Sequence, residues 1–170
     1  MTSANPASSL RVGLVQLRSS RDVAANIAAA SALIREAAQA GARYVQTPET
    51  TNLMELDRGV LFEVLKEEAA DPALLAFRDL ARDLSIHLHI GSLALKVSEK
   101  RAVNRGFLIG PQGEIAARYD KIHMFDVDLP GGESYRESNA YTAGDRAVLA
   151  PVGDIPLGLS ICYDLRFPAL

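Results

Sequence analysis

Cysteine is almost absent from this sequence, because the 170 residues contain only Cys162. One thiol cannot form an internal disulfide, so the chain is not one of the small secreted proteins that depend on a disulfide framework. A reducing, cytoplasmic setting is therefore the simplest expectation.

Long apolar runs are absent as well. No segment approaches the roughly 20 apolar residues that a membrane-spanning helix requires. The opening residues have neither the basic start nor the apolar core of a signal peptide. We therefore expect no membrane partner, and we interpret residues 1–9 as a flexible tail.

The chain also lacks an excess of charge of one sign. Its 18 Lys and Arg residues against 21 Asp and Glu residues give a net charge of -3, which offers no electrostatic reason to expect nucleic acid as a partner. With 48% hydrophobic residues, the chain is rich enough in apolar side chains to build one buried core. We expect residues 10–170 to belong to a single domain.

The first part of the sequence predicts a strand, a helix and a second strand. The aliphatic run Leu10–Leu17 indicates a buried strand. Asp22 can cap a helix whose apolar residues recur at steps of three and four, and Gly41 can end it. Ala42–Glu49 then indicates another strand, so we expect a parallel pair with a right-handed crossover.

The remainder predicts a mixed α/β pattern. The expected elements are a helix after the loop Asn52–Arg58, a helix from Asp71-Pro72, a strand Ile86–Leu95, a hairpin Val103–Lys121 and a last strand Ile155–Cys162. Between them, Ile122–Gly144 is rich in Asp, Gly, Pro and Ser and shows no sustained period. A run of that length inside a compact domain is usually functional or disordered.

Three polar residues fall at the ends of predicted strands: Glu49, Lys121 and Cys162. Functional groups collect outside the carboxyl ends of strands in open α/β sheets. A thiol becomes a nucleophile when a base takes its proton and a cation stabilises the anion. These residue types therefore suit thiol chemistry, although their separation along the chain proves no proximity.

Three blocks of sequence resemble the signatures of the nitrilase, or carbon–nitrogen hydrolase, superfamily. They are "PET" at 48–50, "YDKIHMFDVDLPGGESYRES" at 119–138 and "GLSICYDLRFP" at 158–168. The resemblance implies an α/β fold of the αββα sandwich type, with two mixed sheets between outer helices. It also implies that residues 10–170 form the N-terminal portion of the domain, because members of the family continue with more strands and helices after the third block.

The resemblance assigns roles to individual residues. It implies that Glu49 is the general base, Lys121 the cation that stabilises the oxyanion, and Cys162 the nucleophile. The backbone N–H of Tyr163 would be a second oxyanion donor, and Glu137 would orient the lysine and the substrate. Glu133 is close enough in sequence to compete with Glu137 for that role. The resemblance implies no metal and no organic cofactor.

The blocks are most similar to the branch of amidases that act on deaminated glutathione and on ω-amides. This implies hydrolysis of a small carboxylate-bearing amide by water, in a protein that forms a homodimer or larger homo-oligomer when complete. Three alternatives stay open: another activity of the superfamily, such as a nitrilase or N-carbamoyl hydrolase; a non-catalytic fragment or scaffold; and a redox-sensing thiol.

Other interpretations of single residues also stay open. Free cysteine is often a buried core residue, and that would be the commonest role of Cys162 considered alone. His87 and His89 share one face of a strand, which suits packing better than a metal without a third ligand. Gln46 and Thr47 are polar where relatives of the family usually place apolar residues. Arg166 could pair with an acid or bind a substrate carboxylate.

Overall fold

The computed structural model describes residues 9–170, so the tail expected over residues 1–9 lies outside the described residues except for Ser9. The strands are β1 (Val12–Leu14), β2 (Tyr44–Gln46), β3 (His87–Ser98), β4 (Arg101–Ile109), β5 (Ile115–Asp120), β6 (Asp126–Asp128), β7 (Ser134–Arg136), β8 (Leu149–Val152) and β9 (Ile155–Gly158). The helices are α1 (Val23–Gln39), α2 (Arg58–Val64) and α3 (Pro72–Leu84), with 3-10 turns η1 (Glu68–Ala70), η2 (Glu137–Asn139) and η3 (Cys162–Arg166).

The expected strand–helix–strand unit is present and starts the main sheet. Its first strand is shorter than the predicted Leu10–Leu17 and is not buried, because β1 lies at the edge of the sheet and exposes Val12 and Leu14. β1 and β2 pair in parallel, and β2 pairs in parallel with β3. The Asp22 side chain caps α1 by accepting a hydrogen bond from Ala25 N at 3.0 Å. Gly41 follows the helix with a φ of +89°, a conformation that glycine adopts without a steric penalty.

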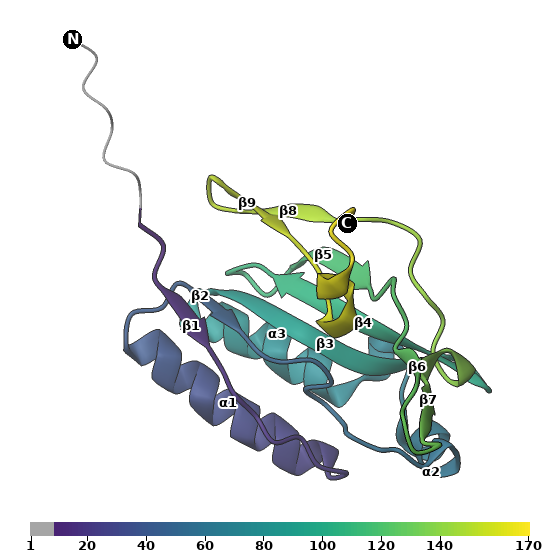
Figure 1. Ribbon diagram of the computed structural model, residues 1–170. Helices are drawn as coiled ribbons and strands as arrows, with labels where there is room; N and C mark the ends of the chain where they lie inside the picture. Colours follow the sequence, from purple (N-terminus) through teal and green to yellow (C-terminus); the bar gives the residue numbers. More distant parts are fainter. Residues whose placement is uncertain (1–8) are drawn as a thin grey trace.

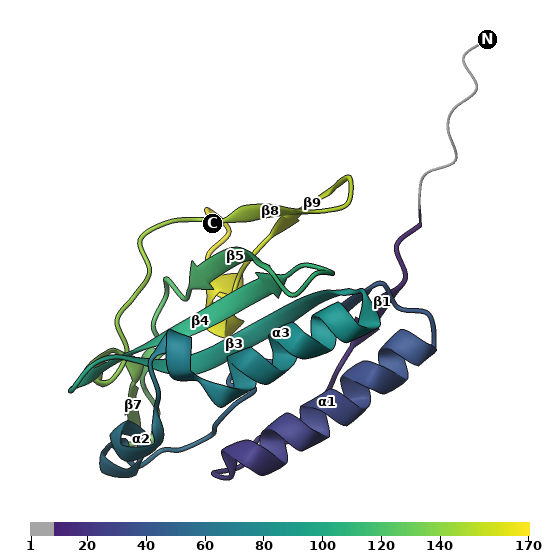
Figure 2. The same ribbon diagram turned by 180° about the vertical axis from the view of Figure 1, so that it is seen from behind.

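The main sheet has five strands in the order β1-β2-β3-β4-β5, with the last two pairings antiparallel. α1 and α3 cover one face of it (Figure 2). Their apolar side chains join those of the sheet in the largest buried cluster, whose fully buried members include Ile34, Phe77, Leu88 and Phe107. Each such side chain contributes about 1.5–3 kcal/mol by leaving water.

The opposite face of the sheet is covered by the β8–β9 hairpin and by η3 (Figure 1). Ala150 and Val152 of β8 pack on Leu108. Leu159 and Ile161, between β9 and η3, pack on Tyr119 of β5. The order of helices, sheet and β-hairpin confirms the α/β class and follows the first layers of the predicted sandwich. It also places the start of η3 over the end of β5.

The structure corrects one further prediction from the sequence and adds elements that the sequence did not predict. The last strand ends at Gly158 rather than Cys162, because β9 pairs only with β8 and Gly158 is opposite the first residue of β8. β8 is not predicted from the sequence. Its Pro151 is tolerated because both strands of a two-stranded hairpin are edge strands. The segment 122–144 contains the short β6–β7 hairpin and η2.

Across residues 9–170, none of the helices combines the length and apolarity that crossing a membrane requires.

Candidate active site

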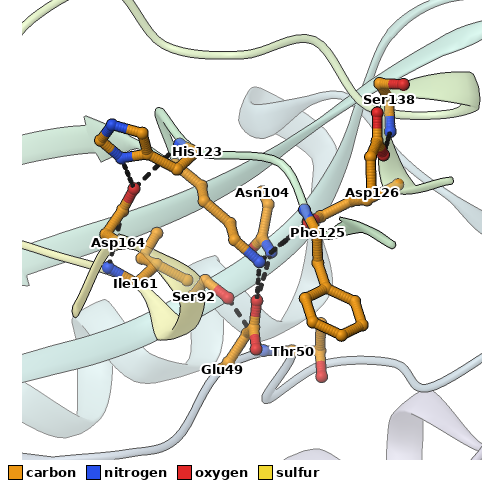
Figure 3. Close-up of polar contacts among 12 residues, drawn as sticks. Glu49, Thr50, Ser92, Asn104, His123, Phe125, Asp126, Ser138, Ile161 and Asp164 are labelled. Atoms are coloured by element: carbon orange, nitrogen blue, oxygen red, sulfur yellow. Dashed lines mark hydrogen bonds and ion pairs between the residues drawn. The ribbon is translucent and has the colours of Figure 1, made fainter. Parts of the chain in front are cut away.

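Glu49 lies in the loop that follows β2, and this loop is held against β3. Thr47 N donates to His89 O at 3.0 Å, and Thr51 N donates to Ser92 O at 2.9 Å. Between these contacts, Thr50 adopts a φ of +50° and its N–H donates to Ser92 Oγ at 2.9 Å (Figure 3). The backbone on both sides of Glu49 is therefore fixed by hydrogen bonds.

Gly91 makes this close approach possible. A Cβ atom at position 91 would lie 2.3 Å from Thr47 O and 2.7 Å from Pro48 O, distances that no side chain tolerates. β3 is irregular at this point, since its pairing with β4 shifts register between Ile90 and Leu93. The bulge and the glycine together allow the loop to lie directly on the strand.

The polar residues Gln46 and Thr47 find partners in the same region. Thr47 Oγ1 accepts hydrogen bonds from Thr51 Oγ1 at 2.8 Å and from Gly91 N at 3.3 Å. Gln46 Oε1 accepts from Tyr44 OH at 3.1 Å. The Thr47 side chain therefore ties the loop that carries Glu49 to β3.

His89 is a packing residue, as the sequence favoured. It is buried, and its Nδ1 lies 2.6 Å from Tyr44 OH. Burial lowers the pKa of His89 to about 4, so its ring is neutral at physiological pH. Among residues 9–170, no three His, Cys, Asp or Glu side chains are placed to hold a metal ion.

Lys121 directly follows β5, and its ammonium is buried between two carboxylates. Nζ lies 3.0 Å from Glu49 Oε1 and 2.9 Å from Glu137 Oε2, and the Lys121 side chain is only 2% exposed. Burial acts to lower the pKa of Lys121, but the hydrogen bonds and charges of Glu137 and Glu49 outweigh it and raise that pKa above its ordinary value. The ammonium therefore stays charged.

Glu137, in η2, is the carboxylate that reaches the lysine. Its Oε2 also accepts a hydrogen bond from the backbone N–H of Phe125 at 2.7 Å, which ties η2 to the segment after Lys121. Glu133, the other candidate, lies exposed at the turn of the β6–β7 hairpin. Among the described contacts of Lys121, Glu137 and not Glu133 is the second partner.

Asn104 joins this group, although sequence reasoning missed it. It lies in β4, and its Nδ2 donates to Glu49 Oε1 at 2.7 Å and to Glu137 Oε1 at 3.3 Å (Figure 3). The Lys121 N–H donates to the Asn104 carbonyl at 3.0 Å. One signal could have identified it: a lone amide side chain in the apolar part of a predicted strand.

Cys162 opens η3 and is exposed, so its interpretation as a core residue is wrong. Its φ of +49° is the left-handed conformation that few residues other than glycine adopt. Desolvation of the sulfur raises the pKa of the thiol, and the charge and hydrogen bonding of Glu49 raise it further, while Lys121 opposes them. The thiol is therefore protonated near neutral pH and needs a base to become a nucleophile.

Asp164 holds the turn that carries Cys162. Its carboxylate accepts hydrogen bonds from Tyr119 OH at 2.7 Å, Ile161 N at 3.0 Å, His123 N at 2.9 Å and His123 Nδ1 at 2.7 Å. Burial acts to raise the pKa of Asp164, but these hydrogen bonds lower it overall. The clamp links η3 to β5 and to the residues after Lys121, and sequence reasoning missed it because its partners are distant in the chain.

The aromatic residues next to the cysteine form a small cluster. The Tyr163 ring meets the edge of Phe125 at a centroid distance of 5.2 Å and that of Phe167 at 5.3 Å. Tyr163 is thereby fixed directly after Cys162, at the position predicted for the second oxyanion donor. Arg166 is exposed and forms no ion pair with an acid of residues 9–170.

Comparison with known proteins identifies the family of the chain. The model of the carbon-nitrogen hydrolase family matches residues 11–170. Human omega-amidase NIT2 is 34% identical over 162 residues, which cover 95% of this chain and 58% of the human protein. Deaminated glutathione amidase from Yersinia enterocolitica is 36% identical over 165 residues, covering 94% of this chain and 56% of that protein. The chain thus spans a little over half the length of these relatives.

Solved structures share the fold. The NitFhit protein of C. elegans superimposes with a TM-score of 0.81 at 31% identity, covering 92% of this chain and 39% of that one. An amidase of the nitrilase superfamily from Nesterenkonia superimposes with a TM-score of 0.79 at 26% identity, covering 96% of this chain and 60% of that one. From the extent of the sequence match and the shared fold, we conclude that the chain belongs to the carbon-nitrogen hydrolase family.

Proposed function

We propose that this chain carries the catalytic residues of an amidase that hydrolyses the C–N bond of a small carboxylate-bearing amide, of the deaminated glutathione or ω-amide type. One observation carries the proposal: the only cysteine stands on an exposed turn, where the charges of Glu49, Lys121 and Glu137 act on its thiol. The Lys121 ammonium is buried and held by the two carboxylates. The names of the two relatives support the substrate class.

The first half of the reaction forms a thioester. Glu49 accepts the proton of the Cys162 thiol, and the sulfur attacks the amide carbon. The carbonyl oxygen becomes an oxyanion, which the Lys121 ammonium and the backbone N–H of Tyr163 stabilise. Glu49 then passes its proton to the amide nitrogen as the C–N bond breaks, and ammonia or an amine leaves.

The second half restores the enzyme. Glu49 removes a proton from a water molecule, and the hydroxide attacks the thioester carbon. A second oxyanion forms against the same donors and collapses, which releases the carboxylic acid. The proton on Glu49 returns to the sulfur of Cys162. Glu137 takes no proton in this scheme and orients Lys121, which agrees with its hydrogen bonds to Lys121 Nζ and Phe125 N.

The required partners are the amide and water, and the reaction uses no metal or organic cofactor. The homodimer or larger homo-oligomer expected for the complete protein belongs to this proposal as well. Light scattering of the complete protein measures its mass in solution, and the mass of a single copy contradicts that part.

Mass spectrometry of the intact protein tests the chemistry. The protein is incubated with α-ketoglutaramate, deaminated glutathione, simple nitriles and N-carbamoyl amino acids, and released ammonia is measured in parallel. We expect an acyl adduct on Cys162 with the first two compounds, and its loss in Cys162→Ala. Adducts with nitriles or carbamoyl compounds alone would contradict the substrate class.

Two further outcomes contradict the enzyme as a whole. Folded protein that forms no adduct and releases no ammonia would favour a scaffold. Reversible oxidation of Cys162 by peroxide without amide turnover would favour a redox sensor.

Arg58→Ala is a suitable control variant for these measurements, because Arg58 is an exposed residue at the start of α2.

A further inference from the structure

Three buried asparagines can be compared in this structure, and one differs from the others. Asn26 uses its whole amide: Nδ2 donates to Ser20 O and Asn52 O, and Oδ1 accepts from Ser20 N. Asn52 also uses its whole amide: Nδ2 donates to Asp71 Oδ2 and Ala94 O, and Oδ1 accepts from Ala94 N. These two are typical structural asparagines, because a buried amide is stable only when its polar atoms are paired.

Asn104 is only half satisfied. It is 2% exposed, its Nδ2 donates to two carboxylates, and its Oδ1 has no hydrogen-bond partner within residues 9–170. Reversing the amide would point that oxygen at the two carboxylates, so their charges fix the orientation. Leaving a buried acceptor unpaired destabilises a protein. The amide nitrogen is therefore the part of this side chain that the site uses.

The two donors that reach Glu49 converge on one of its oxygens. Asn104 Nδ2 and Lys121 Nζ lie 2.7 Å and 3.0 Å from Glu49 Oε1. Glu49 Oε2 accepts no hydrogen bond from a nitrogen atom of residues 9–170. With Oε1 held on two sides, the carboxylate cannot rotate freely, and Oε2 stays available to the thiol.

We propose that Asn104 is a positioning residue that acts through Glu49, by holding Oε1 so that Oε2 faces the Cys162 thiol. The proposal rests on the proposed function, because it gives Glu49 the role of base. The charged groups around the thiol come from three places: Glu49 after β2, Lys121 after β5 and Glu137 in η2. Asn104 contacts both of the carboxylates among them, and its carbonyl accepts from the backbone of the lysine.

The test uses the alkylation of Cys162, because it is the only cysteine and needs no turnover. The rate of its reaction with iodoacetamide is measured by mass spectrometry between pH 6 and pH 11. Since Glu49 raises the pKa of this thiol, a Glu49→Gln variant should be alkylated with a lower pH midpoint. If Asn104 holds Glu49 in place, Asn104→Leu should move the midpoint in the same direction, by about half a unit or more.

A double-mutant cycle separates positioning from general damage. In the Glu49→Gln background, Asn104→Leu should cause no further shift, because the carboxylate through which it acts is gone. An unchanged midpoint in Asn104→Leu overturns the proposal, and so does an equal shift in both backgrounds. Partial unfolding caused by Asn104→Leu would also shift the midpoint equally in both backgrounds. The cycle therefore never counts a damaged variant as support for positioning.

Matched variants complete the design. Asn104→Ala removes the donor without adding a branched side chain, and it replaces Asn104→Leu if circular dichroism shows that the latter is unfolded. Asn26→Ala removes a buried, fully paired amide, so it should lower the melting temperature and leave the midpoint unchanged. The absence of an acyl adduct in the wild-type protein would contradict the amidase proposal but not the role of Asn104. The alkylation cycle would still test that role.

Discussion

The Nζ atom of Lys121 lies 3.0 Å from Oε1 of Glu49, although 72 residues separate them in the sequence. The contact arises because Glu49 follows β2 and Lys121 follows β5, and both β2 and β5 belong to the same sheet. The amide of Asn104, from the strand next to β5, donates to both carboxylates that the lysine contacts. Hydrogen bonds therefore link the loop after β2, strand β4 and the segment after β5 at one end of the sheet.

Replacing Lys121 tests whether its ammonium stabilises the oxyanion. Loss of one such donor raises the barrier by about 2.7–4 kcal/mol, so kcat of Lys121→Met for amide hydrolysis should fall about 100- to 1,000-fold. Steady-state ammonia release measures it. Lys100→Met is the control, because Lys100 is exposed between β3 and β4 and should leave kcat unchanged. Retention of more than a tenth of the wild-type kcat in Lys121→Met would rule out this role.

The pH dependence of Cys162 reactivity tests its electrostatic environment. The pKa of the thiol is raised by desolvation first and by the Glu49 carboxylate second. Alkylation at pH 7 should therefore be slower than that of a free thiol, and Glu49→Gln should accelerate it by lowering the pKa. The initial rate of iodoacetamide labelling measures the effect. Glu133→Gln, at the exposed β6–β7 turn, should label like the wild type, and equal rates for both variants would contradict the assignment.

Asp164 should stabilise the fold in a pH-dependent way. Its pKa is lowered in the folded state, so its contribution is complete above the unfolded pKa of about 3.9 and is lost as pH falls through the lower, folded value. Hydrogen bonds to a charged group contribute about 1.5–3 kcal/mol each, so Asp164→Asn should lose about 3 kcal/mol at pH 7.

Urea unfolding at pH 7 and at pH 3 measures this difference. The loss caused by Asp164→Asn should shrink at the lower pH, because below about 3.9 the unfolded wild-type chain binds a proton at this carboxyl that the folded state releases, which favours unfolding. Asp154→Asn, at the exposed turn of the β8–β9 hairpin, is the control and should change the unfolding free energy little at either pH. A loss that is the same at both pH values would show that charge is not the cause.

Gly91 should be irreplaceable for steric reasons. Alanine at this position would place its Cβ 2.3 Å from Thr47 O, so the loop before Glu49 must move. Overpacking of this kind costs about 1–3 kcal/mol, and Gly91→Ala should lose that much unfolding free energy. Gly59→Ala is the comparison, because Gly59 lies in α2 and an added Cβ would approach Oδ1 of the Asp57 side chain at 3.2 Å. Its loss of unfolding free energy should be smaller than that of Gly91→Ala, since it approaches a side-chain atom rather than backbone.

Local sequence patterns predicted the parts of the fold that depend on local physics. Asp22 caps α1, Asp71 caps α3 by accepting from Leu74 N, and the parallel pairing of β1 with β2 follows from the helix between them. The position of Glu49 and Lys121 at strand ends was also visible in the sequence. Their roles came from the resemblance to the family, and they remain proposals.

The remaining features depend on contacts between distant segments, which no local pattern encodes. Asn104 differs from a surface asparagine only because two acids from other loops converge on it. Asp164 gains its importance from Tyr119 and His123, which lie more than 40 positions earlier. The strand β8 contains a proline and forms only because β9 folds back onto it.

The left-handed backbone of Cys162 has a consequence for the evolution of the chain. Any side chain with a Cβ is strained at a φ of +49°, at a cost of about 1 kcal/mol or more that glycine would not incur. Selection for thermal robustness alone would therefore replace this residue by glycine. If Cys162 is the nucleophile that we propose, its left-handed backbone exchanges folding free energy for reactivity.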